Sequence, residues 1–188
     1  MKIIISCHCD TIFRIPHLRW RDGLLRGALD NFGSMLACAL IIQSMGTDVV
    51  IEFTEDEELT MDGARSLAKS NSNQDTLFIV MDVTSAAKGA RFTIENTHRV
   101  KVRDIRKALT SLKGMYRLIP SGTESEAWLY KDMGFAVIEV DLPVKGGLHS
   151  LDGYADFENV KIVAQAVELL VKYFRDKTIT EIEDTPTS

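Results

Sequence analysis

The sequence predicts an α/β domain in which a mostly parallel sheet lies between two layers of helices. Short apolar runs rich in Ile, Val and Phe alternate with segments of helical periodicity along most of the chain, and this alternation is typical of βαβ units. A length of 188 residues fits one domain, and 45% hydrophobic with 26% charged residues is enough to build a core. We expect a three-layer α/β/α domain with a mixed, mostly parallel sheet over residues 1–177, and a polar, frayed or disordered tail over residues 178–188.

Six segments are expected to form the strands. They are short, dominated by β-branched and aromatic residues, and bounded by turn-forming residues. The segment at 91–95, RFTIE, alternates apolar and polar residues and is therefore expected at an edge of the sheet. In chain order the strands are residues 2–7, 48–54, 77–82, 91–95, 116–119 and 136–140.

Five segments have apolar residues at helical spacing. Gly46, Gly114 and Gly134 follow three of them directly or closely, as is common at helix ends. In the last segment Val160, Val163 and the apolar residues that follow form one stripe, which predicts a face packed on the sheet. The helices are expected at residues 32–45, 62–70, 102–112, 124–132 and 156–174.

Charge and cysteine content exclude several classes of protein. The net charge of −5 and the pI near 5.4 give no overall attraction to nucleic acid or to anionic membranes, so neither is expected as a partner. Cys7, Cys9 and Cys38 are an odd number of cysteines, which favours a reducing compartment over a disulfide framework. The apolar run near the N-terminus is too short for a signal-peptide core, and we expect a cytoplasmic location.

Histidine and acidic residues follow the expected strands at the edge where open α/β sheets bind ligands. His8 and Asp10 follow the first strand, and an Asp at this spacing fixes a histidine tautomer for metal binding, although a surface loop is the plainer alternative. Asp30 precedes an apolar helix, where it either caps the helix or lies between two cations. His149 follows two glycines in a loop and is either exposed and idle or part of the same site.

Four consecutive acidic residues, 55–58, follow the second strand. Such a run is usually a solvated turn or a helix N-terminus. Because adjacent side chains point in different directions, one glutamate of the run could instead bind a metal while its neighbour acts as a base. Asp82 ends the next strand at the same edge of the sheet.

Several segments together resemble the co-catalytic zinc exopeptidases, a superfamily that includes leucyl and glutamyl aminopeptidases, glutamate carboxypeptidase and succinyl-diaminopimelate desuccinylase. The resemblance extends over about residues 3–174, and it is closest to the glutamyl-aminopeptidase branch in GARFTIENTH and SGTESE. The segments that carry it are HCDTI, DGLLRGALDNFGS, IEFTEDEELTMDGA, IVMDVT, SGTESEAW and GGLHSLDGYADFENV.

The resemblance implies a zinc-exopeptidase-like fold with two metal ions bridged by Asp30. His8 and Asp82 would complete the shell of one ion, and Glu58 and His149 that of the other. Ligands of this kind, without thiolates, suit Zn²⁺, with Co²⁺ or Mn²⁺ as replacements.

The resemblance further implies a metallopeptidase, and most directly an aminopeptidase on peptides or small aminoacyl amides. Water would be activated by the metals, Glu57 would act as general base, and Asp10 would orient His8. A deacylase, carboxypeptidase or dipeptidase with the same metals is one alternative. A non-catalytic metal-binding interaction module is another.

Many relatives carry an inserted lid or dimerisation domain, and the spacings from Asp10 to Asp30 and from Asp82 to His149 leave no room for one. We therefore expect a lidless domain whose lid functions are met locally or by a partner subunit in a homo-oligomer. Tyr154 is a candidate to stabilise the oxyanion, with packing under the last helix as its alternative role.

A locally basic segment lies between two of the expected metal-binding stretches. It could bind a substrate carboxylate through arginine contacts, or it could form a solvated rim loop. Its lack of interleaved aromatic residues argues against nucleic-acid binding. The residues that define it are Arg14, His17, Arg19, Trp20, Arg21 and Arg26.

Overall fold

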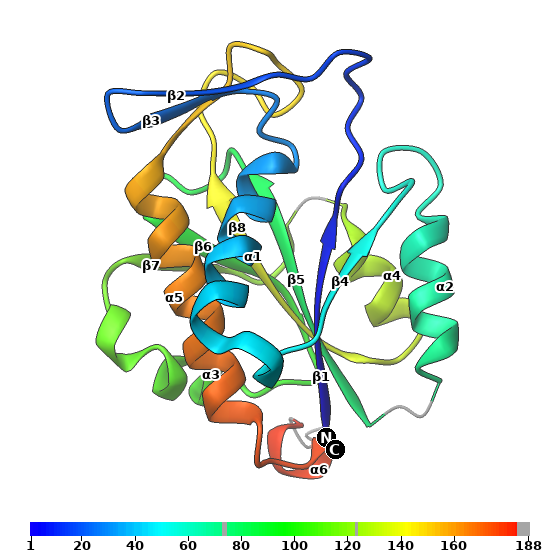
Figure 1. Cartoon of the computed structure of the whole chain (residues 1–188). Helices are drawn as coiled ribbons and strands as arrows, with labels where there is room; N and C mark the ends of the chain where they lie inside the picture. Colours follow the sequence, from blue (N-terminus) through cyan, green and yellow to red (C-terminus); the bar gives the residue numbers. More distant parts are fainter. Residues whose placement is uncertain (73–74, 123, 184–188) are drawn as a thin grey trace.

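The computed structural model describes residues 1–72, 75–122 and 124–183, and within these ranges it confirms the three-layer α/β/α fold (Figure 1). The main sheet has the strand order β4-β1-β5-β8-β6-β7. Neighbouring strands are parallel except for the antiparallel pair β6 and β8. The strands are β1 (Lys2–His8), β4 (Ile51–Thr54), β5 (Thr76–Thr84), β6 (Phe92–His98), β7 (Tyr116–Ile119) and β8 (Ala136–Pro143).

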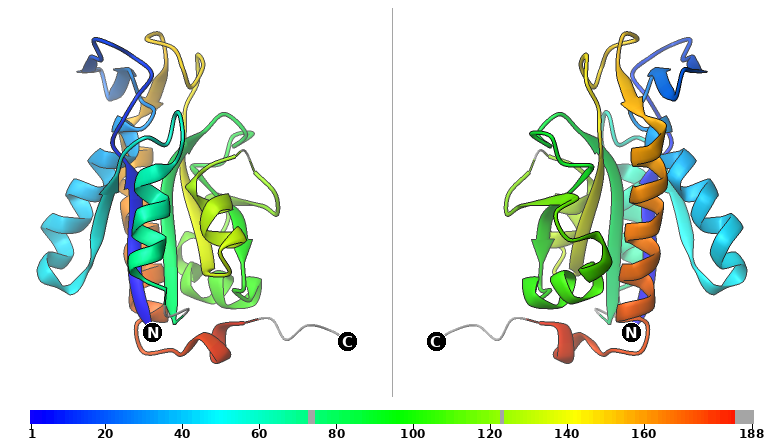
Figure 2. Two further views of the ribbon diagram at one scale, coloured as in Figure 1. Left: turned by 90° about the vertical axis from the view of Figure 1, so that its right-hand side faces the viewer. Right: turned by 90° about the vertical axis from the view of Figure 1, so that its left-hand side faces the viewer.

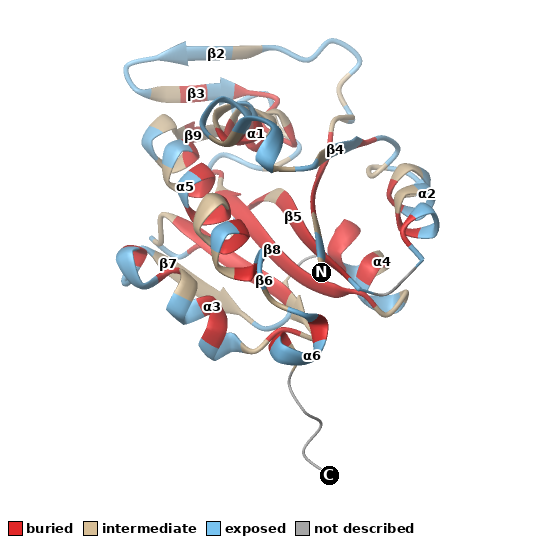
Figure 3. Cartoon of the chain, turned by 60° about the horizontal axis from the view of Figure 1, so that its bottom comes forward, coloured by how far each residue is buried: buried red, intermediate tan, exposed pale blue. Residues whose placement is uncertain are grey.

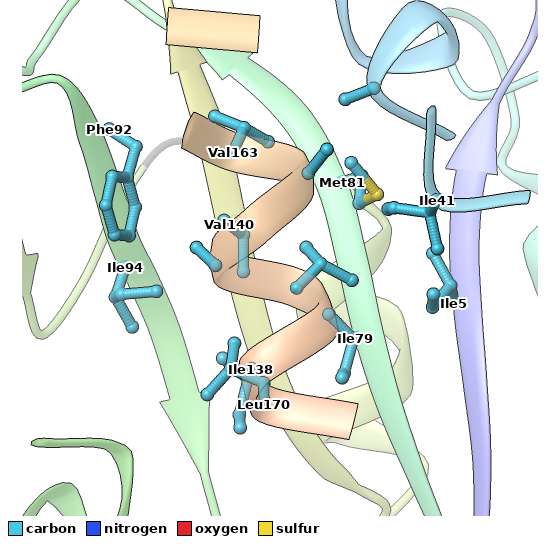
Figure 4. Close-up of a cluster of buried hydrophobic side chains, with 14 of the residues drawn as sticks. Ile5, Ile41, Ile79, Met81, Phe92, Ile94, Ile138, Val140, Val163 and Leu170 are labelled. Carbon is cyan, nitrogen blue, oxygen red and sulfur yellow. The ribbon is translucent and has the colours of Figure 1, made fainter. Parts of the chain in front are cut away.

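Helices cover both faces of this sheet (Figure 2). On one face, Ile79 and Val140 pack with Val163 and Leu170 of α5 (Phe157–Phe174) in the larger hydrophobic core (Figure 4). This core also includes residues of α1 (Phe32–Met45) and α3 (Val102–Ala108). The opposite face packs on α2 (Asp62–Ser70) and α4 (Glu126–Asp132), where Phe78 stacks on Tyr130. The strands at the centre of the fold are accordingly buried on both faces (Figure 3).

The expected edge position of the 91–95 strand is wrong, because β6 lies between β8 and β7. Its polar residues alternate not because they face water but because β8 supplies buried polar partners. The Thr93 hydroxyl lies within hydrogen-bond distance of the carboxyl groups of Glu95 and Asp141, at 2.8 and 3.0 Å. The strands β4 and β7 form the edges instead.

Several boundaries differ from the predicted ones for local reasons. The turn Gly46–Asp48 delays β4 to Ile51, and α3 ends at Ala108, before a separate 3₁₀ turn at Thr110–Leu112. The helices α4 and α5 begin later than expected because Ser125 and Asp156 are their N-caps, each accepting a backbone hydrogen bond through its side chain.

The expectation of a frayed tail is wrong for residues 178–183. They form α6 (Ile179–Ile182), which begins with a capping box between Thr178 and Glu181. Ile182 is fully buried, and Arg99 pairs with Glu183. Ile179 and Ile182, which lie one helical turn apart, therefore anchor this segment to the core. The rest of the predicted tail, residues 184–188, lies outside the described residues.

The sequence did not predict a second, smaller antiparallel sheet of order β2-β3-β9, formed by β2 (Leu18–Arg21), β3 (Leu24–Gly27) and β9 (Tyr154–Asp156). Its β2–β3 hairpin occupies the segment between Asp10 and Asp30, and it lies above the upper end of the main sheet in Figure 1. None of the helices in the described part of the chain is both long and apolar enough to cross a membrane.

Candidate metal centre

The five predicted metal ligands come together at one edge of the main sheet. His8 is the last residue of β1, Glu58 lies in the turn after β4, and Asp82 lies near the end of β5. Asp30 does not follow a strand of the main sheet, as the pattern suggested. It lies between β3 and α1, and His149 comes from the loop between β8 and β9.

Asp30 is the centre of the arrangement. Its Oδ1 lies 3.2 Å from His8 Nε2, and its Oδ2 lies 3.2 Å from His149 Nε2. Asp82 Oδ1 is 3.4 Å from His8 Nε2, while Glu58 Oε2 is 3.2 Å from His149 Nε2. The side chains thus form two groups of three that share Asp30, and the ligand atoms of each group lie within 4.8 Å of one another.

Asp10 connects the histidine with the glutamate turn. Its Oδ1 is 3.3 Å from His8 Nδ1, on the ring edge opposite Asp30 and Asp82. The same carboxylate accepts hydrogen bonds from the backbone N–H groups of Glu57 and Glu58, at 3.3 and 3.2 Å. One side chain therefore holds both the nearby His8 and a turn that begins 47 residues further along the chain.

The acidic run after β4 forms a tight turn rather than a solvated helix start. Asp56 and Met61 adopt positive φ angles of 62° and 56°, and the Met61 amide donates to the Asp56 carbonyl at 2.6 Å. A Cβ on Gly63 would lie 2.5 Å from the backbone of Glu55, so only glycine allows this approach. The turn leaves Glu57 and Glu58 lining the cleft.

The start of α1 is tied to β5 by two side chains. Asn31 donates to the Met81 carbonyl at 2.8 Å, and Ser34 donates to the Asp82 carbonyl at 2.7 Å. The Asp30–Asn31 peptide bond is cis. These contacts hold Asp30 and Asp82 on a common support.

The raised pKa values of the histidine and the carboxyl groups show that the site favours bound positive charge. Burial lowers the pKa of His8, but its hydrogen bonds to Asp30 and Asp82 and the nearby negative charges outweigh burial and raise it to about 12. Burial is also the main reason that the pKa of Glu57 is raised to about 8 and that those of Glu58 and Asp82 are raised.

The donor set fits a pair of divalent cations. In the described residues no lysine or arginine forms an ion pair with Asp30, Glu58 or Asp82, and Glu58 Oε1 is buried without a hydrogen-bond partner. Carboxylate and imidazole donors suit zinc, cobalt and manganese. Cys7 does not belong to the set, because its side chain is buried in the larger hydrophobic core.

A cavity of about 550 Å³, the metal cleft, opens over these groups. Two further charged residues that sequence reasoning did not assign, Arg65 of α2 and Glu124, line it. Glu124 belongs to the SGTESE segment, which was therefore the available signal for it. Tyr154, the candidate oxyanion donor, does not line the metal cleft and instead lies beneath Arg26, 5.2 Å from its guanidinium carbon.

The chain matches the model of peptidase family M28 over residues 1–147. This stretch contains four of the five candidate ligands and ends just before His149. No curated protein matches the chain significantly.

Solved structures share the fold at low sequence identity. Aminopeptidase APDkam598 from the archaeon Desulfurococcus kamchatkensis has a TM-score of 0.66 and 15% identity, covering 92% of this chain and 56% of that one. Aminopeptidase PepT from Bacillus cereus has a TM-score of 0.69 and 11% identity, covering 93% and 81%. The TET1 peptidase of Pyrococcus horikoshii, which can assemble into a tetrahedron or a large octahedral shell, has a TM-score of 0.64 and 19% identity, covering 82% and 52%. The chain thus spans about half the length of the two archaeal structures.

Proposed function

We propose, from the premise that the chain belongs to peptidase family M28 and is a metallopeptidase, that it removes N-terminal residues from peptides or small aminoacyl amides with the help of two metal ions. The proposed catalytic unit comprises residues 1–177. The observation that carries the proposal is the position of Asp30, whose two oxygens each lie 3.2 Å from a different imidazole.

In this proposal His8, Asp30 and Asp82 hold one ion, and Asp30, Glu58 and His149 hold the other. Zinc is the proposed metal, with cobalt or manganese as replacements. When bound, the pair of cations would lower the pKa of water and polarise the scissile carbonyl. Asp10 contributes by holding His8 and the glutamate turn in register.

Glu57 is the proposed general base. It lines the metal cleft but belongs to neither group of candidate ligands, so its carboxylate is available to accept a proton from the attacking water and to pass it to the leaving amine. The Glu57 backbone N–H donates to the Asp10 carboxylate, so the Glu57 side chain is positioned without coordinating a metal.

Glu124 supports aminopeptidase activity over the alternatives. Its side chain is exposed, lines the metal cleft and is not among the candidate ligands. A carboxylate at this position would pair with the free α-ammonium group of a substrate. Substitution of Glu124 by Gln is then expected to raise KM for aminoacyl anilides about tenfold.

Substitution of Glu57 by Gln tests the function directly. Loss of the base should lower kcat by about 10²- to 10⁴-fold, while elemental analysis should still find two metal ions per chain. The matched control is Glu55→Gln, an exposed residue of the same turn that does not line the metal cleft. Full activity of Glu57→Gln would contradict the proposal, and far fewer than two ions per chain with no peptide turnover would favour a non-catalytic metal-binding module.

A specific observation favours a second candidate, a carboxypeptidase, dipeptidase or deacylase with the same metals. Arg65 lines the metal cleft and could pair with a carboxylate at the reacting end of a substrate. A comparison of aminoacyl anilides with N-acyl amino acids distinguishes the two activities, because only the anilides carry a free α-amine and only the N-acyl amino acids carry a free carboxylate.

Two further expectations belong to the proposal. The three cysteines are free thiols, which agrees with a reducing, cytoplasmic compartment. The assembly of the TET1 peptidase supports a homo-oligomer, which light scattering of the purified protein would test.

A further inference from the structure

We infer that the β2–β3 hairpin forms a subsite that binds a carboxylate of a short peptide two or three residues from the scissile bond. The inference rests on the proposed peptidase function and names a substrate feature for it. The subsite is a separate cavity of about 240 Å³, the arginine pocket, lined by His17, Arg19, Arg26, Leu151 and Asp152.

The hairpin has two chemically different faces. Leu18, Trp20 and Leu25 lie on one face and border an apolar pocket with Leu36 and Phe157. Because side chains alternate along a strand, the neighbouring residues of β2 and β3 point the other way. That second face carries Arg19, Arg21 and Arg26.

The position of the arginines is not explained by folding alone. Arg19 and Arg26 are direct partners across the antiparallel pair, and like charges in that position destabilise a hairpin. Residues 11–28 contain four arginines and one acidic residue, although the whole chain is acidic. A bound anion would remove the repulsion between the two guanidinium groups.

The pocket is partly preorganised and keeps a surplus of positive charge. Arg26 lies over the ring of Tyr154 at 5.2 Å, which restricts its guanidinium. Asp152 is the acidic member of the lining, and it offsets one of the two arginines. In the described residues neither Arg19 nor Arg26 forms an ion pair with Asp152 within 4.0 Å.

The arginine pocket is joined to the metal centre by the chain itself. Leu151 and Asp152 follow His149 by two and three residues, so the Cα atoms lie within about 11 Å of His149 at 3.8 Å per residue. The Gly27 amide, next to Arg26, donates to the Gly153 carbonyl at 3.0 Å. An extended peptide rises about 3.3 Å per residue, so about three residues cover a Cα separation of this size.

Peptide kinetics and binding test the subsite together. The peptide Leu-Gly-Gly is compared with its C-terminal amide, and Leu-Gly-Glu-amide with Leu-Gly-Gln-amide, so that a terminal and a side-chain carboxylate are examined separately. In Arg19→Gln and Arg26→Gln, KM for the peptides that bear the preferred carboxylate should rise about tenfold, while hydrolysis of leucine p-nitroanilide, which has no carboxylate, should be unchanged. Calorimetric titration of the same peptides into Glu57→Gln protein measures binding without turnover.

Arg21→Gln is the matched control, because Arg21 lies on the same face of β2, pairs with Asp22 at 3.3 Å and does not line the pocket. A preference for either carboxylate that is lost in the Arg19 and Arg26 variants but kept in Arg21→Gln supports the subsite. Equal KM and equal affinity for all four peptides would overturn it. Binding preference without any turnover of the wild-type protein would uphold the subsite and contradict the proposed peptidase function.

Discussion

At the scale of single residues, the candidate metal centre is held in position by Asp10, which belongs to neither group of candidate ligands. Asp10 contacts His8 Nδ1 and accepts two backbone hydrogen bonds from the glutamate turn. A carboxylate against the outer nitrogen of a histidine fixes its tautomer and makes the inner nitrogen a better ligand. Its contribution should therefore be measurable as metal affinity.

Asp10→Asn is expected to weaken metal binding about 10- to 100-fold, because the amide cannot accept at both oxygens. Zinc competition with a chromophoric chelator measures the effect. The control is Asp22→Asn, at an exposed position with φ of 53° that Asn tolerates well. Unchanged zinc affinity in Asp10→Asn would show that the contact does not position His8.

The candidate ligands could be predicted from the sequence because their order along the chain matched a known superfamily. The structure adds the contacts of Asp30 with both histidines, which no pattern in the sequence reveals. Arg65 and Glu124 were not predicted to lie in the cleft, because Arg65 looks like an ordinary exposed helix residue and Glu124 like part of a helix start. Their positions in the metal cleft depend on how α2 and the loop before α4 fold over the sheet.

At the scale of elements, the β2–β3 hairpin was not predicted although the sequence carries its signal: residues 18–21 alternate apolar and charged, and Asp22-Gly23 is a typical two-residue hairpin turn. The attachment of the hairpin to the rest of the fold depends on Gly27, where φ is 124° and a Cβ would lie 2.0 Å from the His17 carbonyl oxygen. That neighbour is backbone and cannot move aside cheaply. Gly23, in the turn of the same hairpin, also has a positive φ, of 78°, but open space around its Cβ position.

Gly27→Ala should therefore lower the free energy of unfolding by about 3 kcal/mol, combining backbone strain and overpacking. Gly23→Ala should cost about 1 kcal/mol, from strain alone. Urea denaturation followed by circular dichroism compares the two. Equal losses would mean that the close approach at His17 is relieved by movement of the hairpin.

The pair β6 and β8 carries a second group of buried acids beside the candidate ligand Asp82, which is the cross-strand partner of Asp141. Glu139 accepts hydrogen bonds from Asn96 and Ser125. Burial, followed by the charge of Asp82, raises its pKa from the ordinary 4.5 to about 8. The polar letters of RFTIE are explained by this interior network, and a pattern rule that equates polar with exposed fails there.

Stability should consequently decrease with pH in a defined window. The folded protein retains a proton on Glu139 that the unfolded chain releases, so the free energy of unfolding falls as the pH rises from about 4.5 to about 8. Glu139→Gln should make this slope shallower by up to about 1.4 kcal/mol per pH unit, because the amide stays neutral. Denaturation at a series of pH values measures the slope, with the exposed Glu52→Gln as control. An unchanged slope in Glu139→Gln would mean that Glu139 ionises equally in both states.

At the scale of the whole molecule, the candidate metal centre joins segments from almost the full length of the chain. His8 comes from β1, and His149 comes from the loop between β8 and β9. Asp30, at the start of α1, and the turn after β4 lie between these two residues in the sequence. The regular sheet and its helix layers could be predicted from periodicity, since each element carries its own pattern. The meeting of these loops could not, because it depends on strand order.

Removal of the metal should therefore destabilise the protein, because the segments that meet at this edge of the sheet lose their common ligand. A cation that binds only the folded state stabilises it by about 4 kcal/mol at a thousandfold excess over Kd, and for a domain of this size each kcal/mol shifts Tm by about 2–4 °C. Chelation is thus expected to lower Tm by about 10 °C, with recovery on adding zinc. Asp30→Asn should lose this response, because Asp30 belongs to both groups of ligands, whereas Asp22→Asn should keep it. If the Tm of the wild-type protein changes with neither chelator nor zinc, a metal site that links these segments is contradicted. The metal-free protein, with His8 protonated between the carboxylates, would then be as stable as the metal-bound protein.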